Sequence, residues 1–262
     1  MLKSYILKVK NMKKMLKRML IPALLATGTY LIVLLLSIYL TNQSSYLSFP
    51  IEAFVQGSDP PDFFFALFTS IPFSWQMFYI VKDNFLSYVS TRTNVKHYLK
   101  KHIATAMILC FLMVFAVNMI GIVFAVNIAS IDEVSRPDLY SGYILGDMQM
   151  ERPVFFGLIW SAYKGLLGAL ICLLAQIFAY YVQNFFLALL APFMIVFLEN
   201  LFTSILGIPQ FSFTTAFALN RLSAKAMKIQ NLLIGIIFFC TIITVSFLVL
   251  RKYEQKSYSS ES

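Results

Sequence analysis

The chain has 262 residues, of which 59% are hydrophobic and only 13% are charged, and its net charge is +9. Soluble domains contain about 45–50% apolar and about 25% charged residues, so this composition excludes a soluble globular protein. It indicates an integral membrane protein with a single membrane domain, because too little polar sequence remains for a separate soluble domain.

The positive charge of the chain is gathered at the borders of apolar blocks. Fifteen of the 21 Lys and Arg residues lie within 3–18, 82–101 and 251–256. Clusters of this kind set membrane topology and contact anionic lipids. We therefore expect membrane lipids as partners and no nucleic acid.

Residues 1–20 repeat apolar side chains at alternating spacings of three and four, with Lys residues between them. This pattern predicts an amphipathic helix that lies in the membrane interface. The alternative is the basic start of a signal peptide. The apolar block over 21–40 is long enough to span the membrane and no small-residue cleavage site follows it. Both features favour an uncleaved interfacial helix before a first transmembrane helix.

Hydropathy predicts five further spans, over 63–81, 103–128, 153–182, 185–206 and 232–250. Residues 42–62 contain turn-forming and acidic residues but no Lys or Arg, so we expect them to form an external loop. We expect the acidic segment 129–152 to form a second external loop. Pro72 predicts a kink in the second span. Lys164 is expected to extend from the fourth span towards the outer interface.

Segment 207–228 interrupts the apolar pattern with Gly207, Pro209 and several hydroxyl-bearing residues. We expect it to be a re-entrant hairpin on the outer side of the membrane. The prediction is an all-α, polytopic membrane protein with an N-terminal interfacial helix, six transmembrane helices and both termini in the cytoplasm.

The loop over 83–101 is both charged and patterned like a helix. Phe85, Leu86 and Val89 have the spacing that places them on one face of a short helix. From 82 to 101 the chain has five Lys or Arg residues and one Asp, which places the loop in the cytoplasm by the positive-inside rule. We expect this amphipathic helix to contact a partner there.

The sequence contains no Gly-x-x-x-x-Gly-Lys-Ser/Thr phosphate-binding loop and no His-Glu-x-x-His motif. Its two histidines are remote from any pair of carboxylates. Cys110, Cys172 and Cys240 lie in apolar runs, where small buried hydrophobic residues are more common than disulfides or metal ligands. We therefore predict a protein that is not an enzyme and that holds neither a cofactor nor a metal.

A few polar residues lie inside the apolar blocks. Glu199 and Asn200 are candidate pathway or gate residues, because a carboxylate in the bilayer is costly and often functional. A contact from Glu199 to the basic residues of the re-entrant segment is the structural alternative. Asn118 and Asn127 are interpreted either as hydrogen-bonding groups between helices or as pathway residues.

The loop reads Ser87-Tyr88-Val89-Ser90-Thr91-Arg92-Thr93-Asn94-Val95-Lys96-His97-Tyr98-Leu99-Lys100-Lys101. It resembles the membrane subunits of ABC type-2 exporters of the Gram-positive bacterial type. In that family a Thr-Arg pair precedes a basic residue, a Tyr and then a Lys that enters helix three. The layout is also similar, with an elbow helix, six spans and an outer hairpin between helices five and six. The Gly-Thr pair and following Pro of many members are absent here.

The resemblance implies that the loop forms a coupling helix against a separate ABC ATPase. The ATPase-coupling residues would be Asp83, Phe85, Leu86, Tyr88, Val89, Arg92 and Lys96. It also implies a bacterial plasma membrane protein that pairs with a second permease copy or a paralogue. Two ATPase subunits in each complex would bind ATP and Mg.

No charged cavity is evident across the predicted spans, which favours an apolar or amphipathic cargo such as a bacteriocin, a toxin-like peptide or a lipid. The alternative function is a non-transporting immunity or sensor protein that binds a peptide in the bilayer. A secondary transporter is disfavoured, because ion-coupled carriers place several ionisable groups at mid-membrane.

Overall fold

The computed structural model describes residues 2–44, 47, 49–130, 145–182, 184–208, 211, 212, 214, 217, 218 and 229–260. These residues form helices and no β-strand. In chain order the helices are α1 Leu2–Ser44, α2 Glu52–Gly57, α3 Asp59–Phe63, α4 Phe65–Lys82, α5 Phe85–Ser90, α6 Val95–Ile128, α7 Gly146–Glu151, α8 Pro153–Tyr181, α9 Phe185–Ile205 and α11 Ile229–Ser260.

Five helical segments are long and apolar enough to cross a membrane, namely Leu20–Ser44, Val95–Ile128, Pro153–Tyr181, Phe185–Ile205 and Gly235–Lys252. A sixth span is present if α2, α3 and α4 are counted as one bent helix. The predicted blocks all fall on these helices. The chain is therefore a helical, multi-pass membrane protein. Most of the predicted re-entrant segment 207–228 lies outside the described residues.

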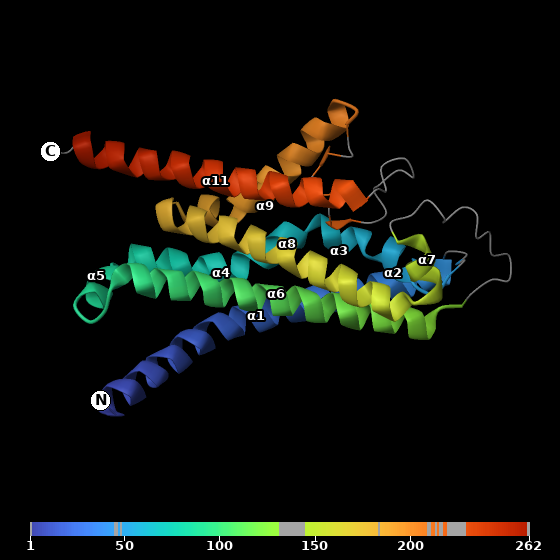
Figure 1. The fold of residues 1–262 in the computed structure, drawn as a ribbon, viewed down its shortest axis with the longest axis horizontal. Helices are drawn as coiled ribbons and strands as arrows, with labels where there is room; N and C mark the ends of the chain where they lie inside the picture. The colour runs from blue at the N-terminus through green and yellow to red at the C-terminus, as the bar shows by residue number, and fades with distance from the viewer. Residues whose placement is uncertain are drawn as a thin grey trace.

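Helix α8 lies at the centre of the bundle and packs against α4, α6, α7, α9 and α11 (Figure 1). Small residues on α8 allow this close packing. A Cβ atom added at Gly157 would lie 2.7 Å from the side chain of Ile122, and one added at Gly165 would lie 3.0 Å from the ring of Phe111. Both neighbours belong to α6, so the glycines of α8 set the distance between these two helices.

Helix α1 packs on the bundle through one face. Tyr30, Leu34 and Ile38 recur at intervals of four residues and are fully buried, whereas Leu25 and Ile32 are exposed where lipid would lie. The interfacial helix predicted over 1–20 is not a separate element, because α1 continues without a break from Leu2 to Ser44. No turn-forming segment separates the two parts, and Pro22 is accommodated inside the helix.

The stretch predicted as an external loop over 42–62 is largely helical. It forms α2 and α3, which pack against α1, and α2 also packs against α6. Turn-forming residues misled the prediction here, since Pro60 and Pro61 lie at the start of α3, where a helix tolerates proline. The kink expected at Pro72 stays a prediction. Helix α4 is continuous through Pro72, and the chain bends by 49° at Phe64, between α3 and α4.

The two ends of the bundle differ in what they carry. Helix α5 connects α4 to α6 at the end of the bundle where α1 begins and where α11 ends (Figure 1). Helices α2 and α7 lie at the opposite end. The three basic clusters noted in the sequence thus belong to segments at a single end of the molecule.

Candidate functional site

The predicted coupling loop contains a helix of six residues, α5. Asn84 precedes it in the left-handed conformation, with φ 51°, which Asn tolerates better than most residues. Asn94 then caps α6, because its side-chain oxygen accepts a hydrogen bond from the backbone N–H of Lys96 at 2.9 Å. Local sequence therefore accounts for both turns that flank α5.

The predicted apolar face of α5 is divided between the interior and the surface. Val89 is only 5% exposed and packs inside the protein, and Leu86 is half-buried. Phe85 and Tyr88 are 38% and 50% exposed, with ring centroids 5.8 Å apart. The Arg92 guanidinium lies 4.4 Å from the centre of the Tyr88 ring, a cation–π contact. Val89 therefore anchors α5, and the two aromatic residues form its outer surface.

Charged side chains surround this outer surface. Four basic residues are exposed around α5, and they are Lys82, Arg92, Lys96 and Lys100. Asp83 is also exposed. The surface thus offers two aromatic rings inside a mainly basic rim, which suits a protein partner with an acidic and apolar face.

A second polar site lies inside the bundle, at a distance from α5. Lys164 of α8 forms an ion pair with Asp62 of α3, with Nζ 2.5 Å from Oδ1, and the two side chains are 0% and 2% exposed. The hydroxyl of Tyr30 on α1 donates to the same carboxylate oxygen at 3.1 Å. The ring of Phe65 lies 5.5 Å from the Lys164 ammonium. Three helices that are distant in sequence therefore meet at one carboxylate.

Two further polar groups belong to this site. Asn118 of α6 is fully buried, donates from Nδ2 to the carbonyl of Val114 at 2.8 Å and lies beside the Tyr30 hydroxyl. Ser161 is fully buried on α8, one helical turn from Lys164. We refer to the five side chains as the interior polar cluster, which comprises Tyr30, Asp62, Asn118, Ser161 and Lys164.

The interior polar cluster has more hydrogen-bond acceptors than it uses. Asp62 Oδ2, Asn118 Oδ1 and Ser161 Oγ are buried and have no hydrogen-bond partner among the described residues. Buried polar groups in proteins are nearly always paired, so three such atoms in one cluster require an explanation. The arrangement is suited to accept N–H or O–H donors from a small polar group.

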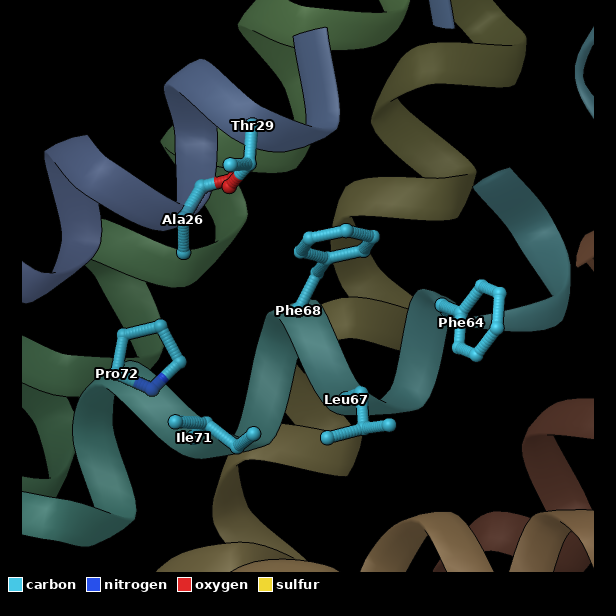
Figure 2. Close-up of a pocket in the computed structure, with 7 residues that line it drawn as sticks. All are labelled: Ala26, Thr29, Phe64, Leu67, Phe68, Ile71 and Pro72. Carbon is cyan, nitrogen blue, oxygen red and sulfur yellow. The ribbon is translucent and has the colours of Figure 1, made fainter. Parts of the chain in front are cut away.

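An apolar groove opens beside this cluster, between α1 and α4. Its volume is about 280 Å³, and Figure 2 shows its lining residues, Ala26, Thr29, Phe64, Leu67, Phe68, Ile71 and Pro72. The Phe68 ring, which lines the groove, lies 5.0 Å from the Tyr30 ring. Tyr30 thus contacts the groove lining with its ring and Asp62 with its hydroxyl.

No family model, curated protein or solved structure matches the chain. Its function must therefore be argued from its own residues. Within the residues that the structure describes, no group of three or more His, Cys, Asp or Glu side chains is arranged to hold a metal ion.

The predicted pathway residues lie in three different places. Asn118 belongs to the interior polar cluster. Asn127 is near the end of α6, is exposed, and donates to the carbonyl of Val123 at 2.7 Å. Glu199 and Asn200 of α9 each accept a hydrogen bond from Ser212, at 3.1 and 3.2 Å. The structure therefore does not bring the four residues together.

The Glu199 and Asn200 contacts hold the chain after α9 against that helix. Thr214 adds a hydrogen bond to Asn200 Oδ1 at 2.7 Å. Arg221 and Lys225, the expected basic partners of Glu199, lie outside the described residues. The three cysteines are free thiols, of which Cys110 and Cys172 are buried as expected, whereas Cys240 is exposed on α11.

The sequence interpretation of Lys164 and Asp62 was wrong. Lys164 does not reach the outer interface, and Asp62 is not in a solvated loop, because each is buried against the other. A buried ion pair therefore lies among the helices, where the sequence had shown no charged cavity. One sequence signal pointed to the pair. Lys164 is the only Lys or Arg between 153 and 220, and a lone cation in an apolar helix needs a buried anionic partner.

Proposed function

We propose that the chain is the permease subunit of an ATP-driven ABC exporter in the bacterial plasma membrane. The observation that carries this proposal is α5, a short helix with an exposed aromatic and basic surface between two long helices. The resemblance of its sequence to the coupling loop of ABC type-2 exporters supports the same reading. ATP and Mg would bind to separate ATPase subunits.

The orientation of the protein in this proposal follows from charge. The basic segments at the start of α1, around α5 and at the end of α11 lie at one end of the bundle (Figure 1). By the positive-inside rule this end faces the cytoplasm, where an ATPase would meet α5.

The packing of α5 provides a route from the ATPase to the membrane helices. Val89 is buried, and α5 packs against both α4 and α6. Both of these helices pack against α8. A displacement of α5 on nucleotide binding would therefore shift α4 and α6 relative to the central helix. A coupling of this kind requires contacts that differ between two states, and the exposed Phe85 and Tyr88 rings are in position to make them.

Two permease subunits, identical or paralogous, would act together with two ATPases. Helix α11 packs mainly on α8 and leaves Ile237, Leu248 and Val249 exposed, and α9 is also largely exposed. These faces suit lipid or a second permease. The cargo is an apolar or amphipathic molecule, such as a bacteriocin-like peptide or a lipid.

The experiment that tests this function is purification of the tagged chain from its native membrane in mild detergent, with mass spectrometry of the proteins that accompany it. We expect a stoichiometric partner with a Gly-x-x-x-x-Gly-Lys-Ser/Thr loop. Arg92→Glu should release that partner, whereas Lys252→Glu should not, since Lys252 is an equally exposed cation outside α5. Purification without an ATPase would contradict the proposal and favour the immunity or sensor function.

A further inference from the structure

We propose that Asp62 is the recognition site for a cationic group on an amphipathic cargo, and that this group displaces the ammonium of Lys164 while the apolar part of the cargo lies in the groove between α1 and α4. This inference rests on the proposed export function and names the class of cargo. It is carried by the unpaired acceptors of the interior polar cluster, by the charge of Asp59 near Asp62 and by the position of the groove.

The first step concerns hydrogen bonding. The cluster has three buried acceptor atoms without partners among the described residues, on Asp62, Asn118 and Ser161. A primary ammonium group has three N–H donors and no acceptor. One such group at the cluster would satisfy acceptors that the Lys164 ammonium, at 2.5 Å from Asp62 Oδ1, leaves unpaired. A carboxylate or phosphate could accept from Ser161 Oγ or from the remaining N–H groups of Lys164, but it would leave Asp62 Oδ2 and Asn118 Oδ1 unpaired.

The second step concerns charge. Helices α2 and α3 contain three carboxylates, those of Glu52, Asp59 and Asp62, and no Lys or Arg. Asp59 is close enough to Asp62 to add to the negative potential there. Lys164 is the only basic residue of α8. The carboxylate of Asp59 therefore adds to the attraction of Asp62 for a cation, and charge interactions are strong in a medium of low dielectric constant.

The third step concerns access. Thr29 lines the groove and is the neighbour of Tyr30, and Phe64 lines it two residues after Asp62. The ring of Phe68, which lines the groove (Figure 2), lies 5.0 Å from the ring of Tyr30, and the Tyr30 hydroxyl donates to the Asp62 carboxylate. Rotation of these two side chains would connect the groove with Asp62. A molecule entering from the bilayer would then place its apolar part in the groove and its cation at the carboxylate.

Exchange of one ammonium for another also explains selectivity. A neutral molecule that separated Lys164 from Asp62 would leave two buried charges unpaired, which is costly. An anionic molecule would pair with Lys164 and leave the Asp62 carboxylate unpaired beside the carboxylate of Asp59. A cationic molecule takes the place of the Lys164 ammonium as the partner of the Asp62 carboxylate, so that only the Lys164 ammonium has to be accommodated elsewhere. When the cargo leaves, Lys164 closes the site again.

The test uses the purified full-length chain in phosphatidylcholine nanodiscs, with radiolabelled dodecylamine as the probe and dodecanol as its uncharged counterpart. The amine is protonated at pH 7. We expect wild-type protein to bind dodecylamine more tightly than dodecanol. Asp62→Asn should weaken dodecylamine binding about thirtyfold or more, the usual effect of removing one partner of a buried charge pair. Lys164→Gln should strengthen it about tenfold, because the competing ammonium is gone.

The opposite signs of the two variants distinguish recognition from a structural role. If Asp62 and Lys164 only hold the bundle together, both substitutions should weaken binding, and that result would overturn the proposal. The double variant Asp62→Asn with Lys164→Gln keeps a neutral hydrogen-bonding pair and should bind the amine no better than the alcohol. Glu151→Gln removes an exposed carboxylate on α7 and should change nothing.

A preference for dodecylamine that persists in the double variant would also refute the proposal. This experiment contains no ATPase. A negative binding result together with successful co-purification of an ATPase would therefore refute the cargo class and leave the export function standing. Selective binding of dodecylamine together with purification without an ATPase would refute the export function. Asp62 would then be a cation site of a peptide-binding protein.

Discussion

The ammonium of Lys164 and the carboxylate of Asp62 form an ion pair inside the bundle, although the two residues are 102 positions apart in the sequence. Desolvation of both charges offsets much of their attraction, so apolar residues in their place would give a similar or greater stability. The pair therefore contributes little to net stability, and a function that needs a charge at this position is the better reason for it.

Replacing one member of the pair should destabilise the protein, whereas replacing both members with apolar residues should not. Lys164→Met leaves the Asp62 carboxylate buried without its cation, and we expect the free energy of unfolding to fall by about 3–5 kcal/mol. Asp62→Leu together with Lys164→Met should restore the wild-type value or exceed it. Thermal unfolding in detergent measures both. A single variant as stable as wild type would mean that the two charges do not form a buried pair.

The glycines of α8 give a second prediction about stability. Gly165→Ala places a Cβ 3.0 Å from the Phe111 ring and 3.1 Å from the Phe111 carbonyl oxygen. We expect a loss of about 1–3 kcal/mol from overpacking. Gly28→Ala is the matched control, since nothing lies within 4 Å of a Cβ at that position of α1. It should raise stability by about 0.5–1 kcal/mol, because alanine favours the helix. Equal melting temperatures for the two variants would contradict the close packing of α6 on α8.

Hydropathy located the membrane spans, because twenty or more apolar residues have few alternatives to a transmembrane helix. The loop with α5 could also be predicted, since its helical spacing and its flanking Asn residues are local signals. Which side of α5 faces inward was not predictable from spacing. Val89 is buried and Phe85 is exposed, and this division depends on how α5 packs against α4 and α6.

The interior polar cluster could not be predicted from local sequence. Asp62 follows Pro60 and Pro61, which resemble a loop until α3 is seen to bring the carboxylate against α8. Lys164 lies in an apolar helix long enough to project from the membrane, and this suggested an interfacial position for its ammonium. The chain bends at Phe64, two residues after Asp62, and the two residues meet through tertiary packing that local sequence does not show.

Helix α5 should depend on Val89 for its position. Val89→Asp would bury an unpaired charge, so we expect α5 to detach from the bundle. Trypsin should then cleave after Arg92 and Lys96 much faster than in the wild type, and an associated ATPase should be lost. Ser90→Asp places the same charge on the neighbouring exposed residue and should preserve both properties. Equal cleavage of the two variants would show that α5 is not anchored through Val89.

His102 offers a test of the polar groups nearer to α5. Its side chain is fully buried on α6, and neither ring nitrogen has a hydrogen-bond partner among the described residues. An unpaired buried polar group costs about 1–3 kcal/mol, so His102→Leu should raise the free energy of unfolding. His97→Leu, at an exposed position of the same helix, should change it by less than about 0.5 kcal/mol. If His102→Leu instead destabilises the protein, the imidazole has a partner such as bound water.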